Sequence, residues 1–215
     1  NDHFAKAPTI QQAAVKFPGF VRKGPRSDDL EFEKGLDVLA ARAAGFFQRM
    51  AKEEKTFFLY LPLTGPHKPV TPHPLFKGKT GLGPYGDFVM NVDNAVGQVL
   101  KALDETKLAD HTHVIFTSDN GSRLDNQGGS NGALRGKKGT TWEGGQRVPG
   151  LMRWPGKIPA RQVRNQLTTT VDLYPTLAAL VGAKMSTDRT IDGVNISSLM
   201  FDGDSGASPR GDFAY

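Results

Sequence analysis

The 215-residue sequence has no cysteine, so neither a disulfide framework nor a thiolate metal site is available to it. No apolar run approaches the length of a membrane span, and there is no internal repeat. The net charge of +5 is spread along the chain, without a dense Lys/Arg block interleaved with aromatic residues. Nucleic-acid binding is therefore disfavoured, and a mildly basic surface or an anionic substrate better explains the charge.

No signal peptide is visible, but the first residue, Asn1, is not an initiating methionine, so a targeting segment is not excluded. Hydrophobic residues make up 38% of the chain, which is enough for a packed core. The 25 glycines and 14 prolines predict many turns and long ordered loops, where functional sites usually lie.

Hydrophobic periodicity predicts two long helices and several short buried strands. A helix is expected over 33–52, with an apolar stripe of Leu36, Leu39, Ala43, Phe47 and Met50. A second helix is expected over 87–105, with Val89, Val92, Val96, Val99 and Leu103 on one face. Continuous apolar runs predict strands at 56–61, 114–117 and 148–154, and a shorter helix is expected over 171–181.

The order strand, loop, helix, strand over 56–117 predicts a parallel βαβ unit. Parallel strands end at the same edge of a sheet, so the loops after Leu61 and Thr117 should lie together. Open α/β sheets bind their ligands at that edge.

His67 follows the first predicted strand and lies between Pro66 and Pro69. Prolines stiffen the backbone, which suits a side chain that meets a substrate at fixed geometry. Taken alone, His67 is better read as a loop histidine without a task.

Asp119 and Asn120 follow the second predicted strand, in the sequence Ser-Asp-Asn-Gly. This is a common turn sequence. The same side chains also offer hard oxygen ligands to Ca²⁺ or Mg²⁺, although two oxygens are too few for a complete site.

The segment 134–145 combines glycines, which let the backbone approach a ligand, with Lys137 and Lys138, which supply charge for an anion. It does not have the spacing of a phosphate-binding P-loop, because Asn131 stands where that motif needs its first glycine. A basic surface loop is the alternative interpretation.

The order of these segments is more specific than any one of them. Gly-Pro-His-Lys-Pro at 65–69, Phe-Thr-Ser-Asp-Asn-Gly at 116–121 and Gly-Lys-Lys-Gly-Thr-Thr-Trp-Glu-Gly-Gly-Gln-Arg-Val-Pro at 136–149 together resemble the type I, formylglycine-dependent sulfatases. Trp-Pro-Gly at 154–156, the 171–177 helix and Asp-Gly at 192–193 fit the same pattern. The resemblance implies an α/β fold, a partial alkaline-phosphatase-like three-layer α/β/α sandwich. Residues 1–190 would belong to the second half of the catalytic domain, and 191–215 would begin a C-terminal subdomain.

The resemblance also implies roles for four residues. Asp119 and Asn120 would bind a divalent cation, Ca²⁺ or Mg²⁺. Lys138 would contact the substrate sulfate, and His67 would lie near the leaving-group oxygen as a general acid. The implied reaction is hydrolysis of a sulfate monoester by a formylglycine nucleophile, with an aryl or carbohydrate sulfate as substrate. Lys137 stands where such sequences often have a small residue and is given no role.

The chain departs from the family pattern in what it lacks. The nucleophile of the family comes from Cys-x-Pro-x-Arg or Ser-x-Pro-x-Arg, and the nearest approach here, Ser208-Pro209-Arg210, has the wrong spacing. The upstream aspartate pair of the metal site and the upstream lysine–histidine pair that holds sulfate are also absent. We therefore expect a piece of a longer sulfatase that is inactive alone.

Two other functions remain open at this point. One is a phosphoester or phosphonate hydrolase of the same superfamily, and the other is a non-catalytic protein that binds a sulfated glycan. The resemblance favours an exported protein, whether periplasmic, secreted or lysosomal in type, and leaves the oligomeric state undefined.

Two minor motifs carry weaker expectations. His111 and His113 alternate at a strand start and are expected to be surface-exposed rather than metal ligands. Asn195 and Asn120 each begin a glycosylation sequon, and a sugar on Asn120 would block the expected metal site.

Overall fold

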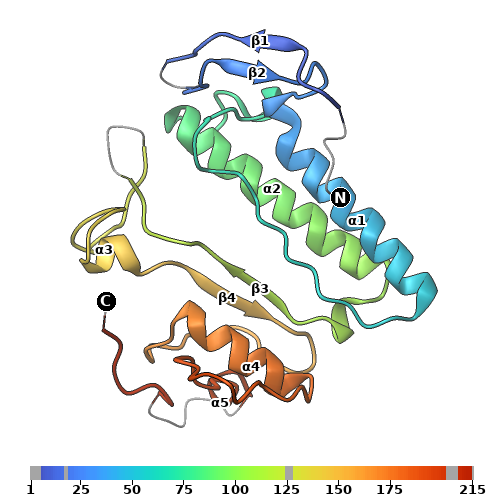
Figure 1. Cartoon of the computed structure of the whole chain (residues 1–215), viewed down its shortest axis with the longest axis vertical. Coiled ribbons are helices and arrows are strands. Elements are labelled where there is room, and N and C mark those ends of the chain that lie inside the picture. Colours follow the sequence, from blue (N-terminus) through green and yellow to red (C-terminus); the bar gives the residue numbers. More distant parts are fainter. Residues whose placement is uncertain (1–5, 17–18, 124–127, 202–207, 215) are drawn as a thin grey trace. The chain divides into compact units, whose positions relative to one another are not determined.

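The computed structural model describes residues 6–16, 19–123, 128–201 and 208–214, which fall into two compact units. The first unit contains the chain up to Ala109 together with 119–148. The second contains 110–118 together with the chain from Pro149 onward. Figure 1 labels the helices and strands of both.

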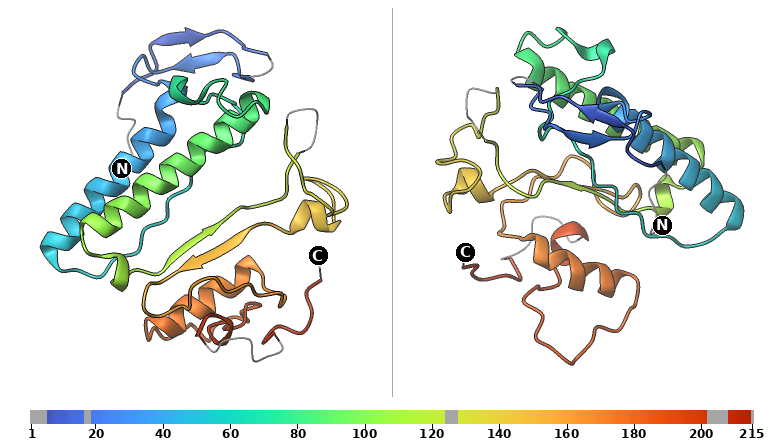
Figure 2. Two further views of the ribbon diagram at one scale, coloured as in Figure 1. Left: turned by 180° about the vertical axis from the view of Figure 1, so that it is seen from behind. Right: turned by 45° about the horizontal axis from the view of Figure 1, so that its top comes forward.

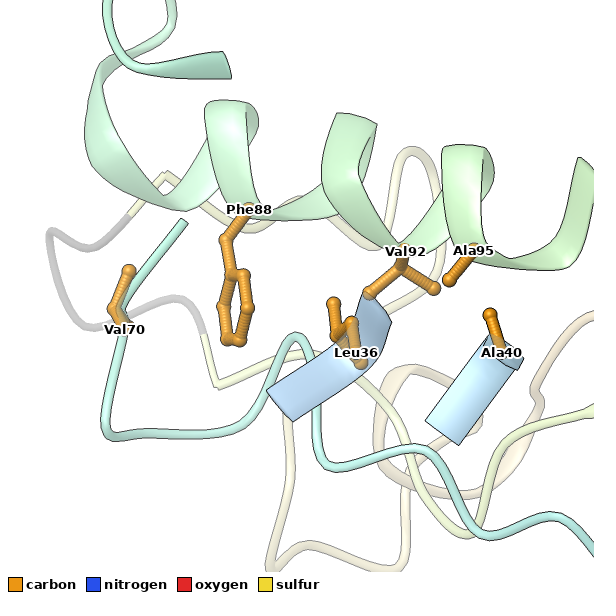
Figure 3. Packing of buried hydrophobic residues seen from close by; sticks show 6 residues of the cluster. All are labelled: Leu36, Ala40, Val70, Phe88, Val92 and Ala95. Carbon is orange, nitrogen blue, oxygen red and sulfur yellow. The ribbon is translucent and has the colours of Figure 1, made fainter. Parts of the chain in front are cut away.

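Two long helices form the core of the first unit and lie side by side in all three views (Figures 1 and 2). Helix α1 spans Gly35–Glu53, after the short 3-10 helix η1 (Phe32–Lys34), and α2 spans Gly83–Glu105. Ala40 and Ala95 are fully buried in the cluster where the two helices pack, and these small side chains permit a close approach (Figure 3). The larger members of this cluster are Leu36, Val70, Phe88 and Val92.

Both helices were predicted, but the buried face of α2 is rotated from the predicted one. Val89, placed on the apolar face by the sequence, is 43% exposed, whereas its neighbour Phe88 is 3% exposed. Burying a side chain such as Phe88 contributes about 1.5–3 kcal/mol. A phenyl ring therefore outweighs the smaller isopropyl group of Val89 in deciding which face turns inward.

A buried carboxylate fastens the loop before α2 to the first turns of that helix. Asp87 accepts hydrogen bonds from the amides of Gly78 (2.8 Å) and Thr80 (3.0 Å) and from the Thr80 hydroxyl (2.8 Å). These donors stabilise the ionised form, and they hold the pKa of Asp87 below its usual value.

Short elements complete the first unit. The strands β1 (Ile10–Gln12) and β2 (Gly24–Arg26) pair antiparallel, with Ile10 opposite Arg26. The 3-10 helix η2 spans Pro74–Phe76, and the one-turn helix α3 spans Glu143–Gln146. A further 3-10 helix, η3 (Ala109–His111), lies where the two units join in the chain.

The strand predicted at 56–61 is not present, so the prediction of a parallel βαβ unit is wrong for the described residues. The segment has no regular secondary structure, and its side chains alternate between half-buried and exposed. Phe58 and Tyr60 are 79% and 76% exposed, which contradicts the expectation of burial on both faces. An extended segment becomes a strand only when a neighbour accepts and donates its backbone hydrogen bonds. None of the described residues does so here.

The second unit contains a two-stranded sheet and a short helix. The strands β3 (Val114–Thr117) and β4 (Gly150–Arg153) pair antiparallel, and both match predicted runs. Helix α4 spans Leu173–Leu180 after the 3-10 helix η4 (Thr170–Asp172), close to the predicted 171–181. The short helix α5 spans Ser198–Phe201.

Asp172 organises the second unit through a capping box at the start of η4. Its carboxylate accepts from the amide (2.7 Å) and hydroxyl (3.1 Å) of Thr169, and from the amide of Val194 (2.9 Å). The hydroxyl of Thr176 donates to the Asp172 carbonyl (2.6 Å) and accepts from the Ile196 amide (3.0 Å). The chain after α4 is thereby tied back onto the helix.

Candidate functional site

The loop that carries His67 is anchored on both sides to the helical core of the first unit. Gly65 lies so close to Val92, Phe88 and Leu36 that an added Cβ would crowd all three side chains. On the other side, Val70 is buried in the core cluster. His67 lies exposed between these two anchors, so its position is set by the packing of α1 and α2.

The ring orientation of His67 is set by one hydrogen bond. Its Nδ1 lies 2.7 Å from the carbonyl oxygen of Lys68. A carbonyl only accepts, so Nδ1 carries the proton in this contact. The remaining ring nitrogen, Nε2, is the atom that is left to meet a substrate.

Asp119 and Asn120 directly follow β3 in the chain and lie in contact with each other. The side-chain amide of Asn120 donates a short hydrogen bond to Oδ2 of Asp119. Asp119 is exposed and Asn120 is half-buried. The structure thus brings together the two oxygen-bearing side chains that the sequence assigned to a cation.

Lys138 lies in a tight turn that Thr140 closes. The amide of Thr140 (3.0 Å) and its hydroxyl (2.8 Å) both donate to the carbonyl of Lys137, and the Lys137 amide donates to that hydroxyl (3.2 Å). Gly136 and Gly139, which flank the two lysines, have φ of 86° and 84°. These left-handed conformations favour glycine. Lys137 and Lys138, between them, are both exposed.

The segment of Asp119 and Asn120 is bonded directly to the turn that carries Lys138. The amide of Gly121 donates to the Gly145 carbonyl (3.0 Å), and the Lys138 amide donates to the Ser122 carbonyl (3.0 Å). An added Cβ at Gly121 would clash with the Gly144 backbone, so only glycine fits there. Three of the four predicted site residues therefore lie in two segments that pack against each other.

His67 belongs to the same compact unit as these three residues. Within the described ranges, however, no hydrogen bond or ion pair joins His67 to any of them. A role for His67 beside Lys138 remains a prediction.

The described residues match a cation site in the chemistry of their donors but not in their number. Asp119 and Asn120 offer oxygen donors of the hard kind that Ca²⁺ and Mg²⁺ prefer, so they fit a cation in chemistry. They fall short in number, because no group of three or more His, Cys, Asp or Glu side chains in the described part of the chain could hold a metal ion.

Sequence reasoning missed several contacts that shape this site. The side chain of Asn131 bridges the segment after Asn120 to the segment before Lys138. The guanidinium of Arg135 lies 3.5 Å from the centroid of the Trp142 ring, within the same loop. Neither contact has a local signature, because its partners are five or more residues apart.

Two further sequence motifs have structural roles in the second unit. Arg210, in the near match to the nucleophile motif, pairs with buried Asp172 at 2.6 Å. His113, expected at the surface, is instead half-buried, with its ring stacked 5.5 Å from that of Trp154. Burial lowers the pKa of His113.

Comparison with known proteins assigns the chain to a family. The model of the Sulfatase family matches residues 4–183, and the chain therefore belongs to the sulfatases. It is 41% identical to N-acetylgalactosamine-6-sulfatase of Canis lupus familiaris, over 77% of this chain and 32% of that protein. It is 44% identical to steryl-sulfatase of Rattus norvegicus, over 78% of this chain and 30% of that protein.

Solved structures confirm the fold class. The chain superposes on the PsFucS1 sulfatase from Pseudoalteromonas sp. with a TM-score of 0.73 and 29% identity, covering 90% of this chain and 41% of that one. It superposes on Ps i-CgsB in complex with k-i-k-neocarrahexaose with a TM-score of 0.69 and 36% identity, covering 76% and 38%. The fold is a partial α/β domain of the alkaline-phosphatase-like type, as the resemblance to the sulfatases implied. The chain spans about a third of the length of the curated relatives it matches.

Proposed function

We propose that this chain carries the sulfate-binding turn and part of the cation site of an enzyme that hydrolyses sulfate monoesters. The observation that supports this most directly is the pair of backbone hydrogen bonds, Lys138 to Ser122 and Gly121 to Gly145. They join a lysine-bearing turn to the segment of Asp119 and Asn120. An ammonium group and a pair of hard oxygen ligands for a cation, on adjoining segments, suit a sulfate monoester group, which is tetrahedral and carries one negative charge.

Each residue has a task that follows from its chemistry. Lys138 places a positive charge where the sulfuryl oxygens lie, and this charge offsets the negative charge they carry in the transition state. Asp119 and Asn120 orient two oxygens toward one side of that group. His67, as an imidazolium whose Nδ1–H is held by the Lys68 carbonyl, delivers its second ring proton from Nε2 to the departing oxygen. A formylglycine residue of the full-length protein would supply the attacking oxygen, and a divalent cation held in part by Asp119 and Asn120 would supply additional positive charge.

We propose sulfated carbohydrates or aryl sulfates as the substrate class. The name of one relative indicates an N-acetylgalactosamine sulfate, a carbohydrate ester, and that of another, arylsulfatase H of Homo sapiens, indicates an aryl sulfate. Among the structural neighbours, Ps i-CgsB was solved in complex with k-i-k-neocarrahexaose, which also favours a carbohydrate substrate.

We propose an exported protein. Asn195, in its sequon, is exposed and accepts a hydrogen bond from the Ser197 amide (2.9 Å), so its side chain lies at the surface. Among the residues that the structure describes, no helix has the length and apolarity required to cross a bilayer.

The function is tested by turnover in the full-length protein that contains this chain. We expect hydrolysis of 4-nitrophenyl sulfate that is lost on chelation and restored by Ca²⁺ or Mg²⁺. Hydrolysis of 4-nitrophenyl phosphate should be much slower. Preference for the phosphate ester would assign the protein to the phosphoester hydrolases, and cation-dependent binding of a sulfated oligosaccharide without turnover would assign it to the non-catalytic binders.

A further inference from the structure

One asparagine side chain bridges the two backbone segments that make up the candidate site. Oδ1 of Asn131 accepts a hydrogen bond from the Ser122 amide (3.0 Å), and its Nδ2 donates to the Gly136 carbonyl (2.9 Å). Ser122 lies two residues after Asn120, and Gly136 lies two residues before Lys138. Asn131 is half-buried between them.

The bridge requires a group that both accepts and donates. Among side chains of this size, only the carboxamide has a planar acceptor and donor on the same carbon. A carboxylate in the same place would accept from Ser122 but would face the Gly136 carbonyl with a second acceptor. It would also face the Ser122 carbonyl, which Nδ2 approaches at the long distance of 3.5 Å.

Ser122 is the residue on which the two segments meet. Its amide is held by Asn131, and its carbonyl accepts the Lys138 amide (3.0 Å). The Asn131 carbonyl also accepts the Leu134 amide (3.0 Å), which turns the chain toward Gly136. Asn131 therefore holds the residue, Ser122, whose carbonyl accepts the backbone amide of Lys138.

We propose that Asn131 is a positioning residue that sets the spacing between the ammonium-bearing turn of Lys138 and the oxygen ligands of Asp119 and Asn120. The proposal rests on the proposed function, since it assigns Asn131 to the same site. It does not require Asn131 to touch substrate or cation. An error of about 1 Å in the placement of catalytic groups can cost about 10²-fold in rate.

The test compares Asn131→Asp, Asn131→Gln and Ser130→Ala in the full-length protein. Asn131→Asp keeps the shape and removes the donor, whereas Asn131→Gln keeps donor and acceptor on a longer arm. Ser130→Ala is the matched control, because it removes only a local exposed contact to the Gly132 amide (3.1 Å) next to Asn131.

Three readouts separate positioning from simple support of the fold. They are hydrogen exchange of peptides covering 119–123 and 135–141, the Ca²⁺ dissociation constant by calorimetry, and kcat and KM for an aryl sulfate. For Asn131→Asp we expect faster exchange in those two peptides only and Ca²⁺ binding weaker by about tenfold or more. We also expect kcat lower by about 10²-fold, with a smaller change in KM. Asn131→Gln should recover part of each loss, and Ser130→Ala should match wild type.

Two results would overturn the proposal. One is Asn131→Asp with wild-type kcat and Ca²⁺ affinity despite faster exchange in the two peptides. The other is exchange that rises throughout the first unit in both Asn131 variants, which would make Asn131 a general support of the fold. A failure of the proposed function is recognised separately, because wild type itself would then neither bind Ca²⁺ nor turn over a sulfate ester. In that case, altered exchange in the two peptides would show that Asn131 stabilises the loop but has no role in a sulfatase site.

Discussion

Arg210 and Asp172 form a buried, multiply hydrogen-bonded ion pair although 38 residues separate them. Nε of Arg210 lies 3.0 Å from both carboxylate oxygens, and its Nη2 lies 2.6 Å from Oδ1. Nη2 also donates to the Asp192 carbonyl (2.7 Å). The pair therefore holds two later segments of the chain against the start of helix α4.

We predict that Arg210→Ala destabilises the second unit strongly. Removing one partner leaves the Asp172 carboxylate buried without its counter-charge, which typically costs about 3–5 kcal/mol. Arg189→Ala is the matched control, because Arg189 pairs with Asp188 at 3.2 Å on the surface and such pairs contribute about 0–1 kcal/mol. Urea unfolding of both variants measures the difference, and equal midpoints would show that the buried pair adds no more than the surface pair.

The same pair predicts a pH dependence of stability. Burial alone would raise the pKa of Asp172, but the Arg210 guanidinium and the amides of Val194 and Thr169 overcome burial and hold that pKa at about 2. A carboxyl with a lowered pKa in the folded state stabilises that state above its ordinary pKa, and this contribution is lost as the pH falls through about 2. The stability advantage of wild type over Asp172→Asn should therefore be constant above about pH 5 and shrink toward pH 2. An advantage that stays constant down to pH 2 would contradict the assignment.

Gly121→Ala should damage the candidate site. The new methyl group would meet the Gly144 backbone, and overpacking of this kind costs about 1–3 kcal/mol. Relief of the clash requires that the segment of Asp119 and Asn120 move away from the turn of Lys138, so Ca²⁺ affinity should fall as well. Gly97→Ala in α2 has open space around its new methyl group and should be neutral or slightly stabilising. Thermal unfolding and Ca²⁺ calorimetry on both variants test this, and unchanged Ca²⁺ binding in Gly121→Ala would show that the close approach is not required for the site.

Asp119→Ala in the full-length protein should reduce both metal content and sulfate-ester turnover. The substitution removes a charge as well as an oxygen ligand from a site for a hard cation. Metal content by mass spectrometry and kcat for an aryl sulfate are the measurements. A variant that keeps full Ca²⁺ occupancy and the wild-type rate would show that Asp119 is only a turn residue and not a metal ligand.

Sequence patterns predicted the positions of the helices better than they predicted which side chains are buried and which segments pair as strands. The two helices follow from apolar residues at spacings of three and four, yet the pattern could not show that Phe88 would turn inward instead of Val89. The 56–61 run has the composition of a buried strand, but a strand depends on hydrogen-bonding neighbours that local sequence does not specify.

For the candidate site, motif order led to the prediction of Asp119, Asn120 and Lys138, and the structure places their two segments in contact. It could not identify Asn131 or Arg210, because their roles come from hydrogen bonds to partners distant in sequence. A single Asn or Arg in a loop carries no local pattern that distinguishes such a role from an exposed side chain.

In the proposed mechanism, Lys138 and His67 act on one sulfate ester, Lys138 on the sulfuryl oxygens and His67 on the leaving group. The measurement is kcat/KM for wild type, His67→Ala and Lys138→Ala across aryl sulfates of graded leaving-group pKa, with Lys137→Ala as the neighbouring lysine control. His67→Ala should be impaired most on poor leaving groups, because those require a proton most. Lys138→Ala should be slower by a similar factor on every substrate, on the order of 10²-fold, and Lys137→Ala should be close to wild type. Equal dependence on leaving-group pKa in wild type and His67→Ala, or a Lys138→Ala variant as active as wild type, would contradict the account.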